Sequence, residues 1–282
     1  MGALRTAIGI ALTAVILYLV LVALLFGMQR RMIFQPDTRP ITPREAGLPA
    51  FQSVETSPGI RSWWHAPADE RAPVILHLHG NGGALAGRAH IFGDMAGWGF
   101  GVLAVGYPGY GGNAASPSEA ALARTAQANY DWLVARGIAP SRIVITAHSM
   151  GTGVAVPLAA RNRAAGLILE SPFTALADVA QRAMPYAPVQ WLIRDPFRSS
   201  DHAGALRMSV GWIHGTADAL IPLSMGQKLF DAIKAPKCAL RIEGGDHDHL
   251  WDMGAADFTR REALAMVATG QCATGPASEP SR

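Results

Sequence analysis

Residues 142–151 read Arg-Ile-Val-Ile-Thr-Ala-His-Ser-Met-Gly, and this stretch decides the fold of the chain. Its apolar first half is typical of a buried strand, and the residues after Ser149 begin a helix-like segment. A tight strand-to-helix turn that exposes a serine hydroxyl is a nucleophile elbow. Such a turn brings backbones together, so it needs small residues two positions before and two positions after the serine. Ala147 and Gly151 meet this need, and we predict that Ser149 is a nucleophile rather than an ordinary serine at a helix start.

Strand-like and helix-like segments alternate along the rest of the chain. Several inner strand-like runs are apolar throughout, which is typical of a parallel sheet covered on both faces. We therefore expect an α/β fold with a mostly parallel, doubly wound sheet. The expected strands are residues 51–56, 60–66, 74–78, 101–106, 142–147, 166–170, 209–213 and 238–243. The expected helices are residues 85–98, 117–136, 150–161, 222–233 and 255–267, and Ser116 is the expected cap of the second.

The composition excludes several classes of protein. Half of the 282 residues are hydrophobic and 16% are charged, which rules out a disordered, collagen-like or coiled-coil chain. A chain of this length can bury a large core and needs neither disulfides nor a metal to fold. We expect one globular domain over residues 32–269, preceded by a distinct segment 1–31 and followed by a disordered tail 270–282.

The N-terminal segment is apolar enough to cross a membrane. Residues 7–28 carry no charge, and at about 1.5 Å per residue they form a helix of roughly 33 Å, enough for a ~30 Å hydrocarbon core. Arg5 flanks one end, and Arg30 and Arg31 flank the other. We predict a single-pass membrane anchor over residues 1–31. The alternatives are a signal peptide, whose apolar region is shorter, and a buried core helix.

The positive charge of the chain sits at the ends of this segment. The formal net charge is +3, and Arg5, Arg30 and Arg31 account for all of it, because the 21 acidic residues all follow them. The globular part is formally neutral and has no basic stripe, so no nucleic-acid partner is expected. The positive-inside rule slightly favours a cytoplasmic domain, because Arg39 adds to the charge after the segment. The asymmetry is too small to assign the side of the membrane.

The two cysteines give no sign of a structural role. Cys238 and Cys272 form neither a Cys-x-x-Cys pair nor a zinc-binding spacing, so nothing indicates a disulfide framework. Cys238 reads as a small residue of the last strand. Cys272 falls in the expected tail.

A serine nucleophile needs a base and an acid that orients the base. Residues 214–218 read His-Gly-Thr-Ala-Asp and follow an expected strand, and residues 244–249 read Gly-Gly-Asp-His-Asp-His and follow the last one. We predict that Asp218 is the acid and His247 the base. With Ser149 they have the chain order of α/β enzymes that carry a nucleophile elbow. All these segments leave the carboxyl ends of strands, where open α/β sheets gather their sites.

An oxyanion hole is expected from the residues that follow the strand 74–78. They read His-Gly-Asn-Gly-Gly, residues 79–83, and glycines let backbone amides approach a substrate. We predict that the N–H groups of Asn81 and Met150 are the oxyanion donors. The residues expected to support these loops are His79, Gly80, Gly82, Tyr107 and Gly151.

Several other assignments stay open. His249 is an alternative base, and Glu170 ends a strand, where it is an alternative acid. His148 is expected to point away from the reacting centre, and His77 reads as a core histidine. Residues 246–249 could chelate a metal on chemistry alone, but consecutive ligands on one loop rarely converge on one ion. We expect no metal and no cofactor.

Taken together, the motifs resemble those of the α/β-hydrolase superfamily and, more narrowly, of its membrane-anchored abhydrolase-domain serine hydrolases. The resemblance spans roughly residues 50–268 and implies an α/β-hydrolase fold with a short cap and an N-terminal transmembrane helix. The motifs are His-Gly-Asn-Gly-Gly (79–83), Gly-Tyr-Pro-Gly-Tyr-Gly (106–111), Pro-Ser-Glu (117–119), His-Ser-Met-Gly-Thr-Gly (148–153), Glu-Ser-Pro-Phe-Thr (170–174), His-Gly-Thr-Ala-Asp (214–218) and Gly-Gly-Asp-His (244–247).

This resemblance implies hydrolysis of ester, thioester or lipid acyl bonds through Ser149, Asp218 and His247. The sequence departs from the family pattern at Ala147, where glycine is usual, and at residues 248–249, where the family often has Asn-Asp.

The substrate class is suggested by the only stretch with room for a cap. It contains residues 184–193, Met-Pro-Tyr-Ala-Pro-Val-Gln-Trp-Leu-Ile, which are short and apolar. We therefore expect a small cap, an open pocket and a small-molecule or lipid-like acyl substrate. The alternatives are a non-catalytic membrane-tethered scaffold and a serine peptidase. The sequence makes no prediction of the oligomeric state.

Overall fold

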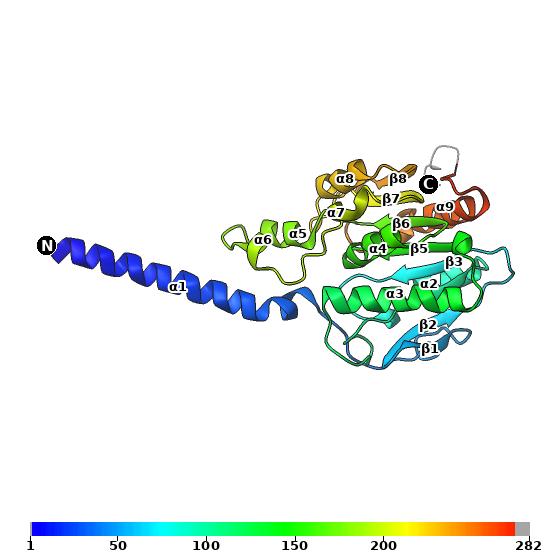
Figure 1. Cartoon of the computed structure of the whole chain (residues 1–282), viewed down its shortest axis with the longest axis horizontal. Helices are drawn as coiled ribbons and strands as arrows, with labels where there is room; N and C mark the ends of the chain where they lie inside the picture. The colour runs from blue at the N-terminus through cyan, green and yellow to red at the C-terminus, as the bar shows by residue number, and fades with distance from the viewer. Residues whose placement is uncertain (1, 274–282) are drawn as a thin grey trace.

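An eight-stranded sheet organises the computed structural model, which describes residues 2–273 (Figure 1). Its strand order is β1-β2-β4-β3-β5-β6-β7-β8. Strands β1 and β2 join by antiparallel pairing, and β3 to β8 run parallel. The eight expected strands and the mostly parallel sheet are confirmed. The strands are β1 (Gln52–Ser57), β2 (Ile60–His65), β3 (Val74–Leu78), β4 (Gly101–Ala104), β5 (Ile143–His148), β6 (Gly166–Glu170), β7 (Ser209–Gly215) and β8 (Lys237–Ile242).

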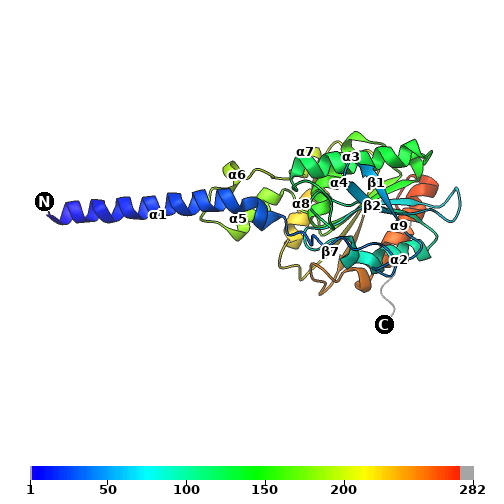
Figure 2. The ribbon, with the colours of Figure 1, turned by 90° about the horizontal axis from the view of Figure 1, so that it is seen from below.

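Helices cover both faces of the sheet, as expected of a doubly wound fold. Figure 2 shows α3 and α4 on one side and α2 and α9 on the other. Short 3₁₀ turns span Leu85–Arg88, Pro140–Arg142 and Trp251–Met253. The α-helices are α1 (Gly2–Ile33), α2 (Ala89–Gly97), α3 (Glu119–Ala135), α4 (Met150–Arg161), α5 (Leu176–Ala183), α6 (Val189–Leu192), α7 (Ser200–Ala203), α8 (Leu223–Ala232) and α9 (Ala255–Thr269).

Two apolar cores lie on the two faces of the sheet. Leu122 of α3 and Val154 of α4 pack in one core, and Phe92 of α2 and Phe258 of α9 pack in the other. Strand β3 contributes alternate side chains to each and is buried along its whole length. Burial on both faces explains why the inner strands are apolar throughout, without the alternation of a half-exposed sheet.

Helix α3 begins later than predicted. Its cap is Ser118, whose hydroxyl accepts the Ala121 N–H at 3.2 Å, and not Ser116. The difference is tertiary. The N–H of Glu119 donates to the Asp195 carboxylate at 2.9 Å, and the Glu119 carboxylate accepts the Phe197 N–H at 2.8 Å. These long-range bonds hold the first turn, and a local sequence pattern cannot indicate them.

Helix α1 projects away from the sheet (Figure 1). None of its residues is buried, so the alternative of a buried core helix is wrong. Its most apolar 18-residue window has a mean hydropathy of 2.9. By length and composition it can cross a membrane, which fits either an anchor or a signal sequence. Arg30, near its end, forms an ion pair of 2.7 Å with the buried Asp195, which joins the helix to the domain.

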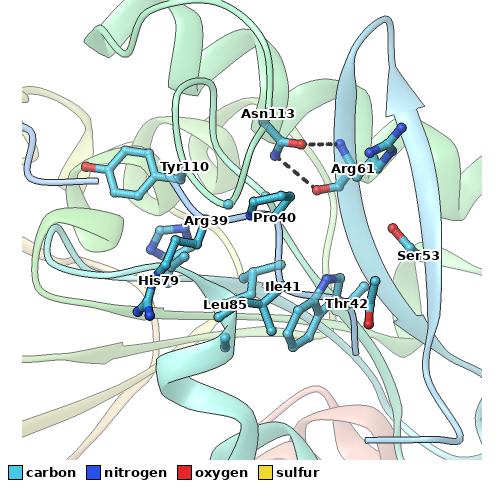
Figure 3. A pocket seen from close by; sticks show the side chains of 15 residues that line it. Arg39, Pro40, Ile41, Thr42, Ser53, Arg61, His79, Leu85, Tyr110 and Asn113 are labelled. Carbon is cyan, nitrogen blue, oxygen red and sulfur yellow. Dashed lines mark hydrogen bonds between the residues drawn. The ribbon is translucent and has the colours of Figure 1, made fainter. Parts of the chain in front are cut away.

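The chain that follows α1 lies along the domain. The Asp37 N–H donates to the Gly83 carbonyl at 2.9 Å, and the Gly83 N–H donates back to the Gln35 carbonyl at 3.3 Å. Further along, residues 39–42 line a small pocket over β2 and the loop at Asn113 (Figure 3). The linker is therefore part of the folded domain and contacts the glycine loop of residues 79–83.

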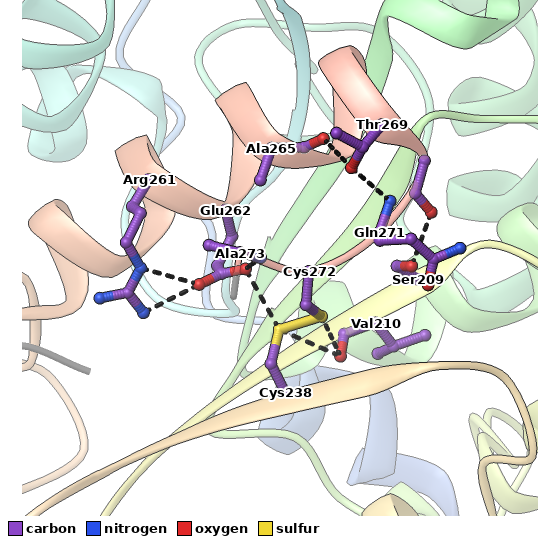
Figure 4. The surroundings of a disulfide bond; sticks show 11 residues. Ser209, Val210, Cys238, Arg261, Glu262, Ala265, Thr269, Gln271, Cys272 and Ala273 are labelled. Atoms are coloured by element: carbon purple, nitrogen blue, oxygen red, sulfur yellow. Dashed lines mark hydrogen bonds and ion pairs between the residues drawn. A yellow bond between two sulfur atoms is a disulfide. The ribbon is translucent and has the colours of Figure 1, made fainter. Parts of the chain in front are cut away.

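A disulfide joins Cys238 of β8 to Cys272, which lies just beyond α9 (Figure 4). The two cysteines are 34 residues apart in the sequence. They meet because α9 crosses back over the sheet, a juxtaposition that cysteine spacing alone does not reveal. The reading of Cys238 as only a small strand residue is therefore corrected.

The expected tail also begins differently from the prediction. Ser209 Oγ donates to the Gly270 carbonyl at 2.8 Å, and the Ala273 N–H donates to the Glu262 carboxylate at 2.8 Å (Figure 4). Residues 270–273 are thereby fastened to the domain. The rest of the expected tail, 274–282, lies outside the described residues.

Candidate active site

Ser149 sits at the turn between β5 and α4, as the sequence pattern predicted. Its backbone has φ 50° and ψ −122°, a strained conformation for a residue with a side chain. A Cβ on Gly151 would clash with the carbonyl oxygens of Leu78 and His79, so only glycine fits there. The Ser149 N–H donates to the Glu170 carbonyl at 2.9 Å, which holds the turn against β6.

The structure brings Ser149, His247 and Asp218 into one hydrogen-bonded relay. Ser149 Oγ lies 2.8 Å from His247 Nε2, and His247 Nδ1 lies 2.7 Å from Asp218 Oδ2. A carboxylate only accepts hydrogen bonds, so Nδ1 carries the proton and Nε2 is free to accept the serine proton. This arrangement of nucleophile, base and orienting acid can support nucleophilic catalysis.

The Asp218 carboxylate is held on all sides. Its Oδ1 accepts the N–H groups of Leu220 at 3.0 Å and Ile221 at 2.8 Å. Burial raises the pKa of this carboxyl, but the hydrogen bonds from His247 and Ile221 outweigh it and leave the pKa below its usual value. Asp218 is therefore ionised at neutral pH. His214, whose Nε2 donates to the Ile221 carbonyl at 2.9 Å, supports the same loop.

One predicted oxyanion donor, Met150, directly follows Ser149 in the chain, and the loop of the other, Asn81, packs against Ser149. Met150 is the first residue of α4, where a helical N–H has no acceptor of its own. Gly80, next to Asn81, packs so closely that a Cβ there would lie 3.4 Å from Ser149 Cβ and 2.8 Å from His148 Nδ1. The loop of Asn81 therefore borders the nucleophile, and the dipole of α4 favours negative charge at the same place.

The loop of Asn81 is braced by residues that the sequence identified and by others that it did not. Tyr107 OH donates to the His79 carbonyl at 3.1 Å, and the centroids of the Tyr107 and His79 rings lie 4.0 Å apart. The Asn81 side chain accepts the Tyr110 hydroxyl at 3.0 Å and the Gln35 N–H at 3.1 Å. Gln35 and Tyr110 were missed as site supports. Only the Gly-Tyr-Pro-Gly-Tyr motif could have pointed to Tyr110.

The alternative bases and acids lie elsewhere. His249 is exposed and pairs with Asp246 at 2.8 Å. The Glu170 carboxylate lies 3.9 Å from His148 Nε2 and, among the described residues, forms no hydrogen bond or ion pair with His247. Burial raises the pKa of Glu170 to about 7.

Two further histidines are neutral and structural. His148 Nε2 donates to the His247 carbonyl at 3.0 Å, so this side chain supports the loop of the base. His77 contacts Thr146 Oγ1 at 2.9 Å and is buried, which confirms its reading as a core histidine. Burial lowers the pKa of each ring to about 3.

A possible metal cluster coincides with the relay. Within residues 2–273, His148, His247 and Asp248 each offer a ligand atom within 4.8 Å of the others. Both ring nitrogens of His247 already have partners in Ser149 and Asp218. A metal held there would have to break the relay, so the donor set does not fit an ion while the relay is intact.

Comparisons with known proteins agree with the fold. The model of a family described as serine aminopeptidase, S33, matches residues 69–199. The uncharacterized protein Rv2307c of Mycobacterium tuberculosis is 34% identical over 230 residues, covering 79% of this chain and 82% of that protein. Lysophosphatidylserine lipase ABHD12 of Xenopus tropicalis is 32% identical over 200 residues, covering 64% of this chain but only 51% of the lipase.

Solved structures share the fold. The Pyrococcus furiosus esterase Pf2001 matches with a TM-score of 0.66 at 18% identity, covering 83% of this chain and 97% of the esterase. A monoacylglycerol lipase of Paleococcus ferrophilus matches with a TM-score of 0.54 at 20% identity, covering 72% of this chain and 96% of the lipase. The chain therefore has the α/β-hydrolase fold and belongs to the α/β-hydrolase superfamily. Within it, the chain is a serine hydrolase of the abhydrolase-domain family.

Proposed function

We propose that this enzyme hydrolyses carboxylic ester or thioester bonds of lipid-like acyl substrates through Ser149, His247 and Asp218. The observation that carries the proposal is the unbroken relay of 2.8 Å and 2.7 Å that starts at a strained elbow serine. A non-catalytic scaffold would have lost a member of this relay. All three members are present in this chain.

The chemistry follows from the positions of these groups. His247 takes the proton of the Ser149 hydroxyl as the oxygen attacks the substrate carbonyl. Asp218 keeps the imidazole in the correct tautomer and stabilises the imidazolium that forms. The N–H groups of Asn81 and Met150 stabilise the oxyanion. His247 then protonates the leaving group, and water hydrolyses the acyl-enzyme by the same steps.

We further propose that residues 1–31 anchor the enzyme in a membrane and that the catalytic domain, expected over residues 32–269, extends to residue 273, because residues 270–273 are fastened to it. The apolar helix α1 ends in Arg30 and Arg31, which suit the edge of a bilayer. Arg30 is paired with the buried Asp195, and the Gln29 side chain accepts the Arg194 N–H at 2.7 Å. These contacts support an uncleaved helix, because they tie its end to the catalytic domain.

The proposed substrate class rests on the relatives and on the apolar cap. Two similar proteins bear the names lysophosphatidylserine lipase and monoacylglycerol lipase. The family description of a serine aminopeptidase favours a peptidase as the second candidate.

A panel of synthetic substrates separates these two candidates. We expect the full-length enzyme to hydrolyse p-nitrophenyl esters from acetate to palmitate and to form a covalent adduct with a fluorophosphonate. We expect little turnover of aminoacyl p-nitroanilides by comparison with the esters. Faster turnover of the anilides than of the esters would instead assign a peptidase.

The Cys238–Cys272 disulfide supports a catalytic domain on the oxidising side of the membrane. Disulfides persist in secreted, lumenal or periplasmic compartments and are rare in the cytosol. We propose this side in place of the slight preference for the cytoplasm that the flanking arginines indicate.

Alkylation with a maleimide polymer tests this assignment. In protein from intact cells quenched with acid, we expect no modification before reduction and two modified cysteines after it. The Cys238→Ser variant is the control and should take one label without reduction, on Cys272. Two labels on the wild-type protein before reduction would contradict the proposed side.

A further inference from the structure

An apolar groove lies between α1 and the cap, which we define as residues 176–193 with helices α5 and α6. The groove is open to one side and has a cavity volume of about 70 Å³. Leu25 and Phe26 of α1 form one wall, and Ala180, Met184 and Leu192 of the cap form the other. Its lining contains one polar side chain, Gln29, and this amide is already satisfied by the backbone at residues 26, 192 and 194. The groove therefore offers an apolar surface without a free hydrogen-bonding partner.

The cap follows α1 far beyond the arginines at the helix end. Tyr18 OH donates to the Tyr186 carbonyl at 3.0 Å. Tyr18 precedes Arg30 by 12 residues, or about 18 Å along a helix, whereas half of a hydrocarbon core is roughly 15 Å. Figures 1 and 2 both show α6 lying beside α1 at the end of the cap that is remote from the sheet. If α1 spans the bilayer with Arg30 at its edge, the tip of the cap at Tyr186 therefore reaches the middle of the hydrocarbon core.

The surface of the cap suits that position. Residues 183–193 carry no charge, and Arg182 and Arg194 flank them. Trp191 is 89% exposed and Tyr186 is 56% exposed. Large exposed apolar groups mark an interaction surface. Trp191 precedes Leu192, whose carbonyl accepts the Gln29 amide, so it lies near the arginine end of α1, where tryptophan favours the membrane interface. Arginine at each end can reach toward the headgroups while its stem stays in apolar surroundings.

The two ends of the cap join the domain near the active site. Helix α5 starts shortly after Glu170, the last residue of β6. The Glu170 carbonyl accepts the Ser149 N–H, and Glu170 lies opposite His148 in the pairing of β5 with β6. Just after the other end of the cap, Phe197 packs so closely on α4 that a Cβ on Gly153 would lie 2.8 Å from Phe197 Cβ. The groove is thus walled by the membrane helix on one side and by an element that begins beside the nucleophile on the other.

We propose that this groove is the docking site for one acyl chain of a bilayer lipid, which enters laterally between α1 and the cap and presents its ester to Ser149. The occupant is a hydrocarbon chain because half of the groove wall is the membrane helix itself and its lining offers no free hydrogen-bonding group. The inference rests on the proposed hydrolase function and on α1 as the anchor.

The depth of the cap is tested without any measurement of activity. The full-length enzyme is reconstituted in phosphatidylcholine vesicles whose acyl chains carry bromine, which quenches nearby tryptophan fluorescence. We expect quenching of a component that Trp191→Phe removes. Trp132→Phe, which alters a tryptophan on α3 packed against Trp64, is the matched control and should leave that quenching in place. Unquenched Trp191 would overturn the inference even if the enzyme is fully active.

The groove itself is tested by filling it. We expect Ala180→Trp to lower the ratio of palmitate to acetate ester turnover in vesicles by about tenfold or more, since excluding two methylene groups from an apolar site already corresponds to roughly that factor. Ala183→Trp changes an exposed residue of the same helix outside the groove and should leave both rates unchanged. An unchanged ratio for Ala180→Trp would overturn the inference. If the wild-type enzyme did not hydrolyse the acetate ester, that result would instead count against the proposed function.

Discussion

Replacing Ser149 with alanine is expected to lower kcat for p-nitrophenyl acetate by roughly four to six orders of magnitude. The hydroxyl is the atom that forms the acyl bond, and no neighbouring side chain can replace it. The same variant should lose the fluorophosphonate adduct, whose mass is read directly on the intact protein. Residual turnover above the uncatalysed rate would come from the oxyanion donors and substrate binding alone.

The fold of this variant is expected to survive. Within the described residues, Ser149 Oγ hydrogen-bonds to His247, so the substitution removes one hydrogen bond and leaves the core intact. An unchanged melting temperature is therefore the control for folding. Undiminished ester turnover by Ser149→Ala, with the adduct still forming elsewhere, would refute the assignment of the nucleophile and leave the family membership untouched.

The second large effect is expected at the base and its orienting acid. His247→Ala should be about as damaging as Ser149→Ala, because the members of such a relay act as a unit. Asp218→Asn should lower kcat by about ten-thousandfold, because an amide at that position favours the wrong imidazole tautomer. Stopped-flow or steady-state rates on the same acetate ester measure both.

His249→Ala is the matched control for the base. His249 lies two residues from His247 but is exposed and pairs with Asp246, so its removal should change kcat by no more than about twofold. The acid has a control as well. Glu170→Gln keeps the shape of a side chain that lies near His148 and, within residues 2–273, forms no hydrogen bond or ion pair with His247, so its effect should be far smaller than that of Asp218→Asn. The reverse order in either pair would move the base or the acid to the other residue.

The relation of the disulfide to the catalytic chemistry is indirect. Cys238 and Cys272 fasten the end of α9 to β8, whereas His247 lies on the loop that follows β8. A disulfide stabilises a fold mainly by restricting the unfolded chain. Its reduction should therefore affect thermal stability more than the rate of ester hydrolysis.

Much of the site could be predicted from the chain because each part is encoded locally. The turn at Ser149 needs small neighbours within two residues, and Ala147 and Gly151 display that need directly. Asp218 follows the buried strand β7, and His247 follows the edge strand β8, whose side chains alternate between more exposed and more buried positions. Parallel strands bring their carboxyl ends to one edge of the sheet, so these separate segments converge there.

Other features depend on contacts between distant segments. The N-cap residue of α3 is Ser118 rather than the predicted Ser116, because Asp195 and Phe197 bind the first turn of the helix. The brace from Gln35 to Asn81 needs the linker to lie against the glycine loop. Neither residue type nor spacing predicts such a contact, because the packing of distant segments decides which residues meet.

The sequence by itself therefore determined the class of fold and a segment able to span a membrane, and it predicted Ser149, His247 and Asp218, which the structure brings into one relay. All of these rest on patterns a few residues long, such as apolar strands, a glycine two residues after a serine and an uncharged stretch long enough for a bilayer. The tertiary structure alone decided the Cys238–Cys272 pairing, the fastening of residues 270–273 and the groove between α1 and the cap. Each of these depends on which surfaces meet after folding, and that choice is made by the burial of whole faces, which no short stretch of sequence contains.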